Sequence, residues 1–526
     1  MATFNSTAVH EVSFTQADYN HMLNRFGFHA ETREIIEKED LLPLGLMQRL
    51  HRAYPKYSSF KEDIPFMFND KKQYVGLKGF HEIVEILKQH GYEIGHIEER
   101  ELFIKVYRFM ATRHVLNIID WENFATDSLF QLVFPQPGML RKEFVDAYFA
   151  AQSDQEKEAL LESYIQSTHP HDGKQKLNKP VFRNENGELE IIDGSQHKYP
   201  QCQLLFDVQT QTCFAFCTYC FRHAQVRGDE DMFLQKDIAQ VHRYLRMHKE
   251  VTDVLITGGD AGYLSAERFE AYITPIIEDP SLSHIKTIRL GTRILSYMPE
   301  KILSPEYNPM LELIKKLVDN GIQLVFMSHF STPREIMNPV TVAAIRRLRK
   351  AGATLKSQSP IMNHISLFMD ENGKVDIDRT SQNWIDLGNL LAMLGVGFHS
   401  IYMARATGEH HYFTAPLAEI NKVFQKIYRS LASINRPSRY ITMTSSAGKI
   451  SLLGVVEIDG EKAFALKVNE GRNMEWMDKV FLAQYDEKET VLANLKPFHA
   501  QKHFFEDELA EIEKKLEAAL YYGDQD

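Results

Sequence analysis

The stretch CFAFCTYC, residues 213–220, holds Cys213, Cys217 and Cys220 in a Cys-x3-Cys-x2-Cys spacing. Thiolates are the ligands that iron–sulfur clusters prefer, and three of them can hold a 4Fe-4S cluster and leave one iron open. A zinc ion would need a fourth nearby ligand, for which His223 is the local candidate. Ordinary buried thiols are the remaining alternative. The spacing therefore favours an iron–sulfur cluster.

The region around this stretch alternates between β-type and helical periodicity, which is typical of parallel βα units. Short apolar strands bounded by Gly and Pro suit a sheet that is covered on its outer face by helices. We therefore expect an α/β fold, with a curved or partial (β/α) barrel rather than a flat doubly wound sheet. In a barrel the active site lies where the strands end. Six strands are expected, at 203–209, 253–259, 285–291, 322–330, 354–360 and 397–404.

The segments on either side of this region have different patterns. Helical periodicity dominates the first part of the chain, which we interpret as a structural cap or an oligomerisation surface, so that a homo-oligomer is expected. Alternation of the β type follows the stretch TSSAGK, and the tail DELAEIEKKLEAAL consists of strong helix formers. The expected divisions are a helical region (1–198), the barrel (199–435), a small α+β segment (436–500) and a terminal helix (501–526).

Composition indicates a globular protein that works in a reducing compartment. Hydrophobic residues make up 44% and charged residues 25% of the chain. The formal net charge of −11 argues against a nucleic-acid partner. The first residues, MATFNSTAVHEVSF, lack the pattern of a signal peptide, and the most apolar window, 387–404, contains polar residues and glycines and does not predict a membrane span. Few cysteines and an oxygen-sensitive cluster favour the cytoplasm.

Eight fragments of the chain together resemble the lysine 2,3-aminomutase family of radical S-adenosylmethionine (SAM) enzymes over roughly residues 199–486. They occur in the family's order: YPQ (199–201), CxxxCxxCxR (213–222), VLITGGDAGYLS (254–265), IRLGTR (288–293), SHFSTPREI (328–336), LKSQSPIM (355–362), IYMARATGEHHYFTAP (401–416) and TSSAGKI (444–450). The resemblance implies a partial six-stranded radical SAM barrel with helical flanks. It implies three cofactors: a 4Fe-4S cluster held by the three cysteines, SAM bound at the open iron, and pyridoxal phosphate (PLP). It also implies an external reductant such as flavodoxin or ferredoxin.

The resemblance assigns several residues to SAM. Tyr219 would lie against the adenine, or would only shield the cluster from water. Gly258, Gly259 and Asp260 would receive the methionine amino group, because a glycine pair lets backbone approach a ligand closely and a carboxylate suits an ammonium group; an ordinary turn is the alternative. Residues at the ends of other strands would line the SAM pocket, or would be satisfied buried polar groups: Arg293, His329 and Gln358.

Lys449 is the candidate for the PLP lysine and hence for a catalytic residue, because it ends the stretch aligned with the family's PGGGGK loop. A lysine can form a Schiff base with PLP, which the substrate amine then displaces. A surface lysine is the alternative. The aligned loop here has lost three of the four glycines, and the family arginine expected in the YP segment is missing. Tyr199 and Tyr402 match family positions near this cofactor.

The substrate positions differ from those of the lysine enzymes. Arg222 matches the arginine that holds the substrate α-carboxylate, a use that suits its bidentate fork. Two aspartates that pair with the distal ammonium of lysine are replaced here by Arg405 and Thr442. Because an ammonium buried without a partner is strongly destabilised, lysine is disfavoured and glutamate or aspartate is preferred. Arg405 could instead pair with Glu409.

The sequence thus predicts a PLP-dependent radical SAM 2,3-aminomutase, an isomerase, that acts on an amino acid other than lysine. By resemblance, a 5'-deoxyadenosyl radical removes a hydrogen from the β-carbon and the amino group migrates. One alternative is a radical SAM enzyme of the same family that works without PLP on an unknown substrate. Another is a non-catalytic iron–sulfur protein.

Overall fold

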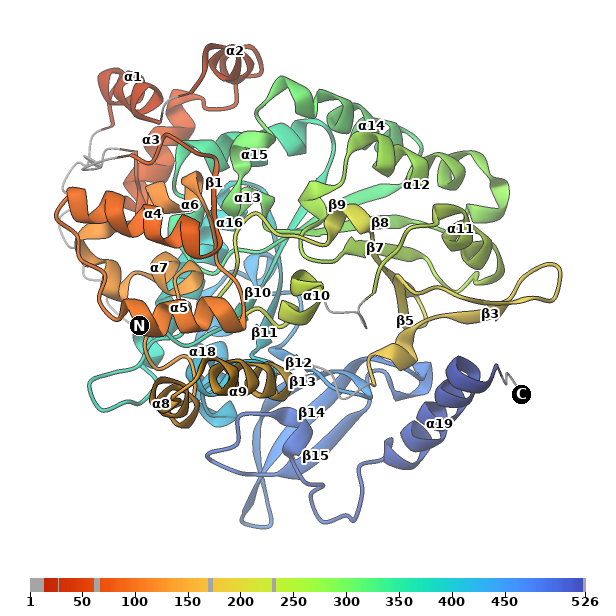
Figure 1. Cartoon of the computed structure of the whole chain (residues 1–526). Coiled ribbons are helices and arrows are strands. Elements are labelled where there is room, and N and C mark those ends of the chain that lie inside the picture. The colour runs from red at the N-terminus through yellow and green to blue at the C-terminus, as the bar shows by residue number, and fades with distance from the viewer. Residues whose placement is uncertain (1–13, 27, 61–66, 169–173, 229–232, 524–526) are drawn as a thin grey trace.

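The computed structural model describes residues 14–26, 28–60, 67–168, 174–228 and 233–523 (Figure 1). Its centre is an eleven-stranded mixed sheet in the order β15-β14-β13-β12-β11-β10-β9-β8-β7-β6-β5. The fold is therefore α/β, as expected, and its mixed sheet has more strands than the six that were expected.

The six strands predicted around the cysteine stretch are present, and each runs parallel to the next. Because neighbours are in register, as Phe206 with Thr257 and Thr292 with Ser328 show, their carboxyl ends meet at the same edge of the sheet. The segments that follow these ends carry most of the predicted site residues. The strands are β6 (Cys202–Phe206), β7 (Asp253–Thr257), β8 (Thr287–Thr292), β9 (Gln323–Ser328), β10 (Thr354–Ile361) and β11 (Gly397–Met403).

Helices connect these strands, and in Figure 1 α11, α12, α14 and α15 lie outside the sheet. Their ends follow local sequence rules. In α15, for example, the side chain of Asn338 accepts from the Thr341 amide at 2.9 Å and Pro339 occupies the first turn. The longer helices are α11 (Ile238–Met247), α12 (Ala266–Glu278), α14 (Asn308–Asp319), α15 (Pro339–Lys350), α16 (Ile377–Met393) and α18 (Leu417–Ser430); the shorter ones are α10 (His223–Arg227), α13 (Ile294–Tyr297) and α17 (His410–Phe413).

The sheet continues beyond the six parallel strands on both sides. β5 pairs antiparallel with β6, β12 pairs parallel with β11, and β13 to β15 are antiparallel. The β-like C-terminal segment therefore belongs to the same sheet as the cysteine region. The bounds are β5 (Ser195–Tyr199), β12 (Thr442–Thr444), β13 (Gly448–Ile458), β14 (Glu461–Gly471) and β15 (Val480–Gln484).

The predicted tail helix is α19 (Glu506–Tyr522), and it is docked rather than free. Glu508 accepts a hydrogen bond from the Trp476 indole at 2.6 Å, and Lys174 pairs with Glu513 at 3.2 Å. The tail thus contacts both the C-terminal strands and a segment that precedes β5.

The N-terminal part is mostly helical, as its periodicity indicates, and it packs against segments that connect the parallel strands (Figure 1). No helix in the described ranges is long and apolar enough to cross a membrane. The elements are α1 (Gln16–Arg25), α2 (Ala30–Lys38), α3 (Leu44–Ala53), β1 (Gln73–Val75), α4 (Gly76–Gln89), α5 (Ile97–Val106), β2 (Met110–Thr112), α6 (Arg113–Ile118), α7 (Ser128–Val133), α8 (Lys142–Ala150), α9 (Asp154–Ser167), β3 (Val181–Arg183) and β4 (Leu189–Ile191).

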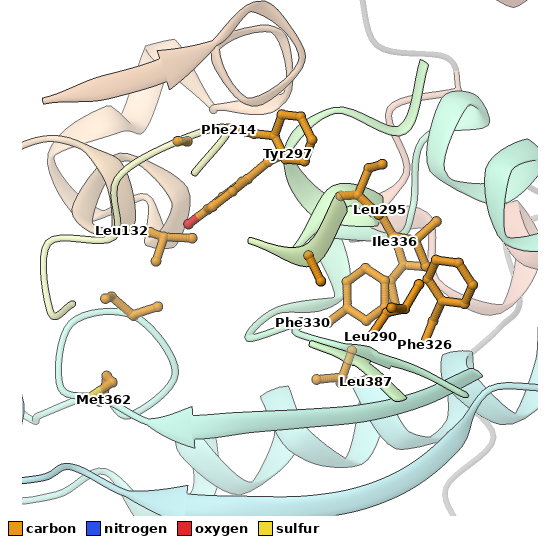
Figure 2. Packing of buried hydrophobic residues seen from close by; sticks show 14 of the residues in the cluster. Leu132, Phe214, Leu290, Leu295, Tyr297, Phe326, Phe330, Ile336, Met362 and Leu387 are labelled. Atoms are coloured by element: carbon orange, nitrogen blue, oxygen red, sulfur yellow. The ribbon is translucent and has the colours of Figure 1, made fainter. Parts of the chain in front are cut away.

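Apolar side chains from strands and helices form the core. Figure 2 shows Leu290 and Phe326 beside Phe330, Ile336 and Leu387. All five are buried. This packing fixes the strands whose ends carry the site.

Candidate active site

A cavity of about 250 Å³ lies against the sheet, between strands that come from both the parallel and the antiparallel parts. Alternate residues of a strand face the same side, and the wall follows this rule with Cys202 and Leu204 on β6 and with Thr442 and Thr444 on β12. The wall contains many of the predicted site residues: Tyr199, Tyr219, Arg222, His329, Gln358, Tyr402, Arg405, Thr442 and Lys449.

The cysteine stretch is held in place by the N-terminal region. The Phe216 amide donates to the Met110 carbonyl at 2.8 Å, and the Thr218 amide donates to the Leu132 carbonyl at 2.9 Å. Gln73 donates to the Phe214 carbonyl at 2.5 Å. The loop therefore depends on contacts with residues far away in the sequence, which its motif does not indicate.

The three cysteines fit an iron–sulfur cluster as a donor set. All are free thiols. Burial raises the pKa of Cys213 well above its usual value and that of Cys220 to about 12. Such thiols stay protonated at neutral pH until a metal centre supplies positive charge, which deprotonates a coordinating thiol. The cluster would be held by the sulfurs of Cys213, Cys217 and Cys220.

A single zinc ion at these cysteines is less well supported. The ligand atoms that bind one metal ion must lie close together. Among the described residues, one group of at least three His, Cys, Asp or Glu side chains has its ligand atoms within 4.8 Å of one another. It consists of His197, His248 and Glu250. The cysteines are not in this group. His223, the other zinc candidate, places its Nε2 atom 3.0 Å from the Thr168 carbonyl.

The two glycines after β7 pack against the cysteine loop. Gly258 has φ +143°, and a Cβ there would lie 2.5 Å from the Thr210 hydroxyl. A Cβ on Gly259 would lie 2.5 Å from the Thr212 carbonyl oxygen and 3.1 Å from the Cys213 sulfur. Only glycine allows this approach.

Asp260 binds the end of the neighbouring strand. Its carboxylate accepts from the Thr292 hydroxyl, from the Arg293 amide at 2.9 Å and from the Gly262 amide at 2.8 Å. Burial raises its pKa. Both carboxylate oxygens thus accept hydrogen bonds from within the protein, so Asp260 connects the end of β7 to the end of β8.

Tyr219 and His329 form a polar corner of the cavity. The Arg293 guanidinium donates to the Tyr219 hydroxyl at 3.2 Å, and that hydroxyl lies 3.1 Å from His329 Nε2. Burial lowers the pKa of His329 well below its usual value, so the uncharged imidazole can share a hydrogen bond with the Tyr219 hydroxyl. Arg293 itself pairs with Glu335 at 2.7 Å and does not line the cavity.

Two partly buried arginines lie near one aromatic ring. Arg222 and Arg405 place their guanidinium carbons 5.1 and 4.3 Å from the Phe221 ring centre. Burial lowers the pKa of both, that of Arg222 to about 10. Arg405 donates to Thr444 at 3.3 Å. Within the part of the chain that the structure describes, neither arginine has an ion pair, so both cations are available to an anion in the cavity.

The expected alternative, a pair between Arg405 and Glu409, is wrong. Glu409 is buried and accepts hydrogen bonds from Tyr107 and Tyr164, each at 2.8 Å. These tyrosines belong to the N-terminal region, which the local sequence around Arg405 could not indicate.

Thr442 and the pair Tyr402–Gln358 complete the predicted wall. The Thr442 hydroxyl donates to the Tyr440 carbonyl at 2.7 Å and lies 2.9 Å from Ser451. Tyr402 donates to Gln358 at 3.4 Å. Neither arrangement supplies a counter-charge for an ammonium group.

Lys449 lies at the start of β13 and points to the cavity next to Tyr199, whose ring centre is 4.9 Å from the amine. The amine donates to Glu470 at 2.5 Å, and Arg439 pairs with the other carboxylate oxygen. Burial alone would lower the pKa of Lys449, but Tyr402, Tyr199 and Glu470 raise it above its usual value. Burial would raise the pKa of Glu470, but Lys449 and Arg439 lower it to about 2.

Lys198, which the sequence motifs did not single out, is a second amine on the same wall. Its amine donates to the Ser445 carbonyl. Burial, followed by the charges of Arg472 and Arg405, lowers its pKa well below the usual value. Its place directly before Tyr199 in the YP segment was the available signal. Glu470 was also missed, because it lies 21 residues from Lys449 on another strand.

The donor set also fits PLP. An amine lies in the wall at Lys449, and the Lys198 amine and the Thr444 hydroxyl offer hydrogen bonds that a phosphate needs. Among the described wall residues there is no Asp or Glu. The cavity is therefore suited to ligands with several anionic groups.

No protein-family model matches the chain. Several curated proteins do match parts of the chain. A protein of Aquifex aeolicus, provisionally named L-lysine 2,3-aminomutase, is 28% identical over 52% of this chain and 67% of its own length. Glutamate 2,3-aminomutase of Clostridioides difficile is 33% identical over 32% of this chain and 37% of its own. L-lysine 2,3-aminomutase of Acetoanaerobium sticklandii is 26% identical over 51% of this chain and 59% of its own.

Solved structures overlap weakly. Streptococcus suis SuiB bound to S-adenosylmethionine has 13% identity and a TM-score of 0.31, over 56% of this chain and 57% of that one. A radical SAM methyltransferase from Sphaerobacter thermophilus has 14% identity and a TM-score of 0.28, over 51% and 77%.

The curated relatives and the ordered motifs point to the same class: the chain is similar to proteins named as 2,3-aminomutases. The similarity is distant, at 26–33% identity for these three relatives, and they include enzymes named for lysine and for glutamate. The chain spans between 37% and 67% of the length of these three relatives.

Proposed function

We propose that this protein is a radical SAM, PLP-dependent 2,3-aminomutase that acts on an amino acid with an anionic side chain, with glutamate and aspartate preferred over lysine. Its six parallel strands would form the partial barrel of this superfamily. The cluster would bind at Cys213, Cys217 and Cys220, and an external donor such as flavodoxin or ferredoxin would reduce it.

The observation that carries the proposal is the convergence of three sets of residues on one cavity. Tyr219 joins the cysteine loop to the wall, Lys449 supplies an amine, and Arg222 and Arg405 supply two cations without ion pairs among the described residues. The charge of Arg405 disfavours the charged form of Arg222, so an anionic ligand between the two cations would be stabilising.

Three side chains would bind or orient the reacting groups. Arg222 would hold the α-carboxylate and Arg405 the side-chain carboxylate, so that the substrate is fixed at both ends before reaction. Glu470 holds the Lys449 amine in place. When bound, the reduced cluster with SAM supplies the 5'-deoxyadenosyl radical that takes a hydrogen from the β-carbon, and PLP supplies the π-system for amino migration. The apolar wall excludes water from this chemistry.

A second candidate is the same radical chemistry without PLP, and one contact favours it. Lys449 is held by Glu470 as a protonated ion pair, whereas only a neutral amine can attack a carbonyl. The loss of glycines before Lys449 points in the same direction.

The test is an anaerobic assay of reconstituted protein with SAM, a chemical reductant and a panel of amino acids. We expect 5'-deoxyadenosine and an isomerised β-amino acid, with glutamate or aspartate ahead of lysine. Arg405→Gln should raise KM for the preferred substrate about tenfold or more, the scale of one lost charge pair. Faster turnover of lysine than of either acid would contradict the substrate assignment.

PLP is tested in the same preparation. Wild-type protein should show the visible absorbance of PLP bound to a lysine, and borohydride should remove it. Lys449→Ala should lose this absorbance and keep the cluster, whereas Lys467→Ala, on β14 with an ion pair to the exposed Asp478, should keep both. If wild-type protein supplied with PLP shows no such absorbance but still cleaves SAM, the second candidate replaces the first. A protein with a cluster but no SAM cleavage would be non-catalytic.

A further inference from the structure

We propose that Tyr297, together with Arg293, sets the reduction potential of the cluster by donating hydrogen bonds to the sulfur of Cys217. This inference rests on the proposed ligation by the three cysteines, and it assigns a role to Tyr297 that its sequence does not indicate. The role is one of tuning through another residue, since Tyr297 does not line the cavity.

The geometry at Cys217 is that of a sulfur with two donors. The Tyr297 hydroxyl lies 2.9 Å from the sulfur, and Arg293 donates to it at 3.3 Å. A cysteine that ligates iron is a thiolate and carries no proton. The Tyr297 hydroxyl must then be the donor in this bond.

Tyr297 has no competing acceptor in the described part of the chain. Its side chain is buried, with 1% of the residue exposed, and Cys217 is the partner of its hydroxyl. Figure 2 shows this hydroxyl pointing away from the core residues Leu290, Phe326 and Phe330. A buried hydroxyl without a partner is destabilising. The Cys217 sulfur therefore stabilises the buried Tyr297 by accepting a hydrogen bond from its hydroxyl.

Both donors are fixed by other contacts. The Tyr297 backbone carbonyl accepts from Thr112 of the N-terminal region. Arg293 lies with its guanidinium carbon 4.5 Å from the Tyr297 ring centre and pairs with Glu335. The other oxygen of Glu335 accepts from the Ser331 and Thr332 amides at 2.5 and 3.0 Å. The donors therefore have little freedom to leave the sulfur.

The other two cysteines have different surroundings. Among the described residues, no side chain donates to the sulfur of Cys213 or Cys220. Gly259 packs against the Cys213 sulfur, at 3.1 Å from the position of its absent Cβ. Both donors therefore contact the same ligand, Cys217, and one of them, the Arg293 guanidinium, is positively charged.

The physical effect follows from the charge that reduction adds. One electron enters the cluster and makes its sulfurs more negative, so hydrogen bonds to those sulfurs stabilise the reduced form more than the oxidised form. Hydrogen bonds with an ionised partner are also stronger than neutral ones. Tyr297 and Arg293 therefore raise the potential and make the cluster easier to reduce.

The experiment is an anaerobic redox titration of the reconstituted protein without SAM or substrate, with the reduced cluster followed by electron paramagnetic resonance. Tyr297→Phe keeps the ring and removes the donor. At a fixed solution potential we expect about a tenfold lower ratio of reduced to oxidised cluster, which corresponds to ~59 mV for a one-electron couple. Iron content should equal that of wild type.

Tyr263→Phe is the matched control. The Tyr263 ring stacks on Phe214 with centres 4.2 Å apart, and its hydroxyl donates to the Cys213 carbonyl at 3.4 Å rather than to a sulfur. This variant should titrate like wild type. A wild-type potential in Tyr297→Phe would overturn the inference, as would an equal shift in Tyr263→Phe.

Two further outcomes are decisive. If Tyr297→Phe does not assemble a cluster, replacing Tyr297 by fluorotyrosine keeps the ring and strengthens the donor, and the potential should rise; an unchanged potential would overturn the inference. If wild-type protein assembles no cluster, the proposed function and this inference fail together. If Tyr297→Phe assembles a normal cluster with an unchanged potential, this inference fails and the proposed function is unaffected.

Discussion

Two lysines on one cavity wall show how strongly neighbours determine the state of a residue. Lys449 has Glu470 as a partner and two tyrosines beside it, which raise its pKa. Lys198 has a backbone carbonyl as its acceptor and positive charges around it, which together with burial lower its pKa. The same side chain therefore holds its proton more tightly at one position than at the other.

The Lys449–Glu470 pair predicts a pH-dependent contribution to stability. Glu470→Gln leaves a buried ammonium without a counter-ion, and we expect a loss of about 3 kcal/mol at neutral pH. The folded pKa of Glu470 is about 2, below its unfolded value, so the wild-type advantage is present above the unfolded pKa. It is lost as pH falls from there through about 2.

Urea unfolding of wild type and variant at several pH values measures this difference. Glu461→Gln is the control, because Glu461 lies on the same strand and is exposed; it should change stability by less than about 0.5 kcal/mol. A wild-type advantage that grows on acidification would contradict the expected sign of the pH dependence.

At the scale of elements, the loop that follows β7 supports the cysteine loop by direct backbone contact. Gly258 and Gly259 approach residues 210–213 more closely than any side chain allows. The Asp260 carboxylate then ties this loop to the end of β8. The spacing of the three cysteines is therefore maintained by a neighbouring strand end and not by the cysteine loop alone.

Gly259→Ala tests this support. The new methyl group would meet the Thr212 carbonyl oxygen at 2.5 Å, so the cysteine loop must move, at a cost of about 1–3 kcal/mol. We expect a lower iron and sulfide content after reconstitution. Gly454→Ala is the control, since a Cβ there meets nothing within 4 Å. Full iron content with an unchanged cluster spectrum would show that the loop does not need this contact.

At the scale of the whole molecule, the local patterns were predictable and the distant contacts were not. The six parallel strands follow from periodicity within short segments, and the cavity residues follow from motifs at strand ends. In contrast, Tyr107 and Glu409 meet across 302 residues, and Arg293 reaches Cys217 across 76. No local pattern marks such pairs, because they depend on how segments far apart in the chain pack around the site.

The N-terminal region holds both loops that form the site. Met110 and Leu132 bind the cysteine loop through backbone hydrogen bonds. Tyr107 and Tyr164 bind Glu409, in the segment after β11 that carries Arg405 into the cavity. This region therefore positions the loops of the candidate site and is more than a cap.

Replacing both Tyr107 and Tyr164 with phenylalanine tests this role. Glu409 would keep its buried carboxylate without either donor, and each lost hydrogen bond to a charged group is worth about 1.5–3 kcal/mol. Because both bonds end on the same oxygen, the two effects should not add. We expect faster amide hydrogen exchange in residues 404–413, measured by mass spectrometry. Tyr148→Phe, whose hydroxyl bonds Lys105, is the control and should leave this segment unchanged. Unaltered exchange in the double variant would mean that the segment after β11 is held by its other contacts, such as the hydrogen bond of His410 to the Arg405 carbonyl at 2.7 Å.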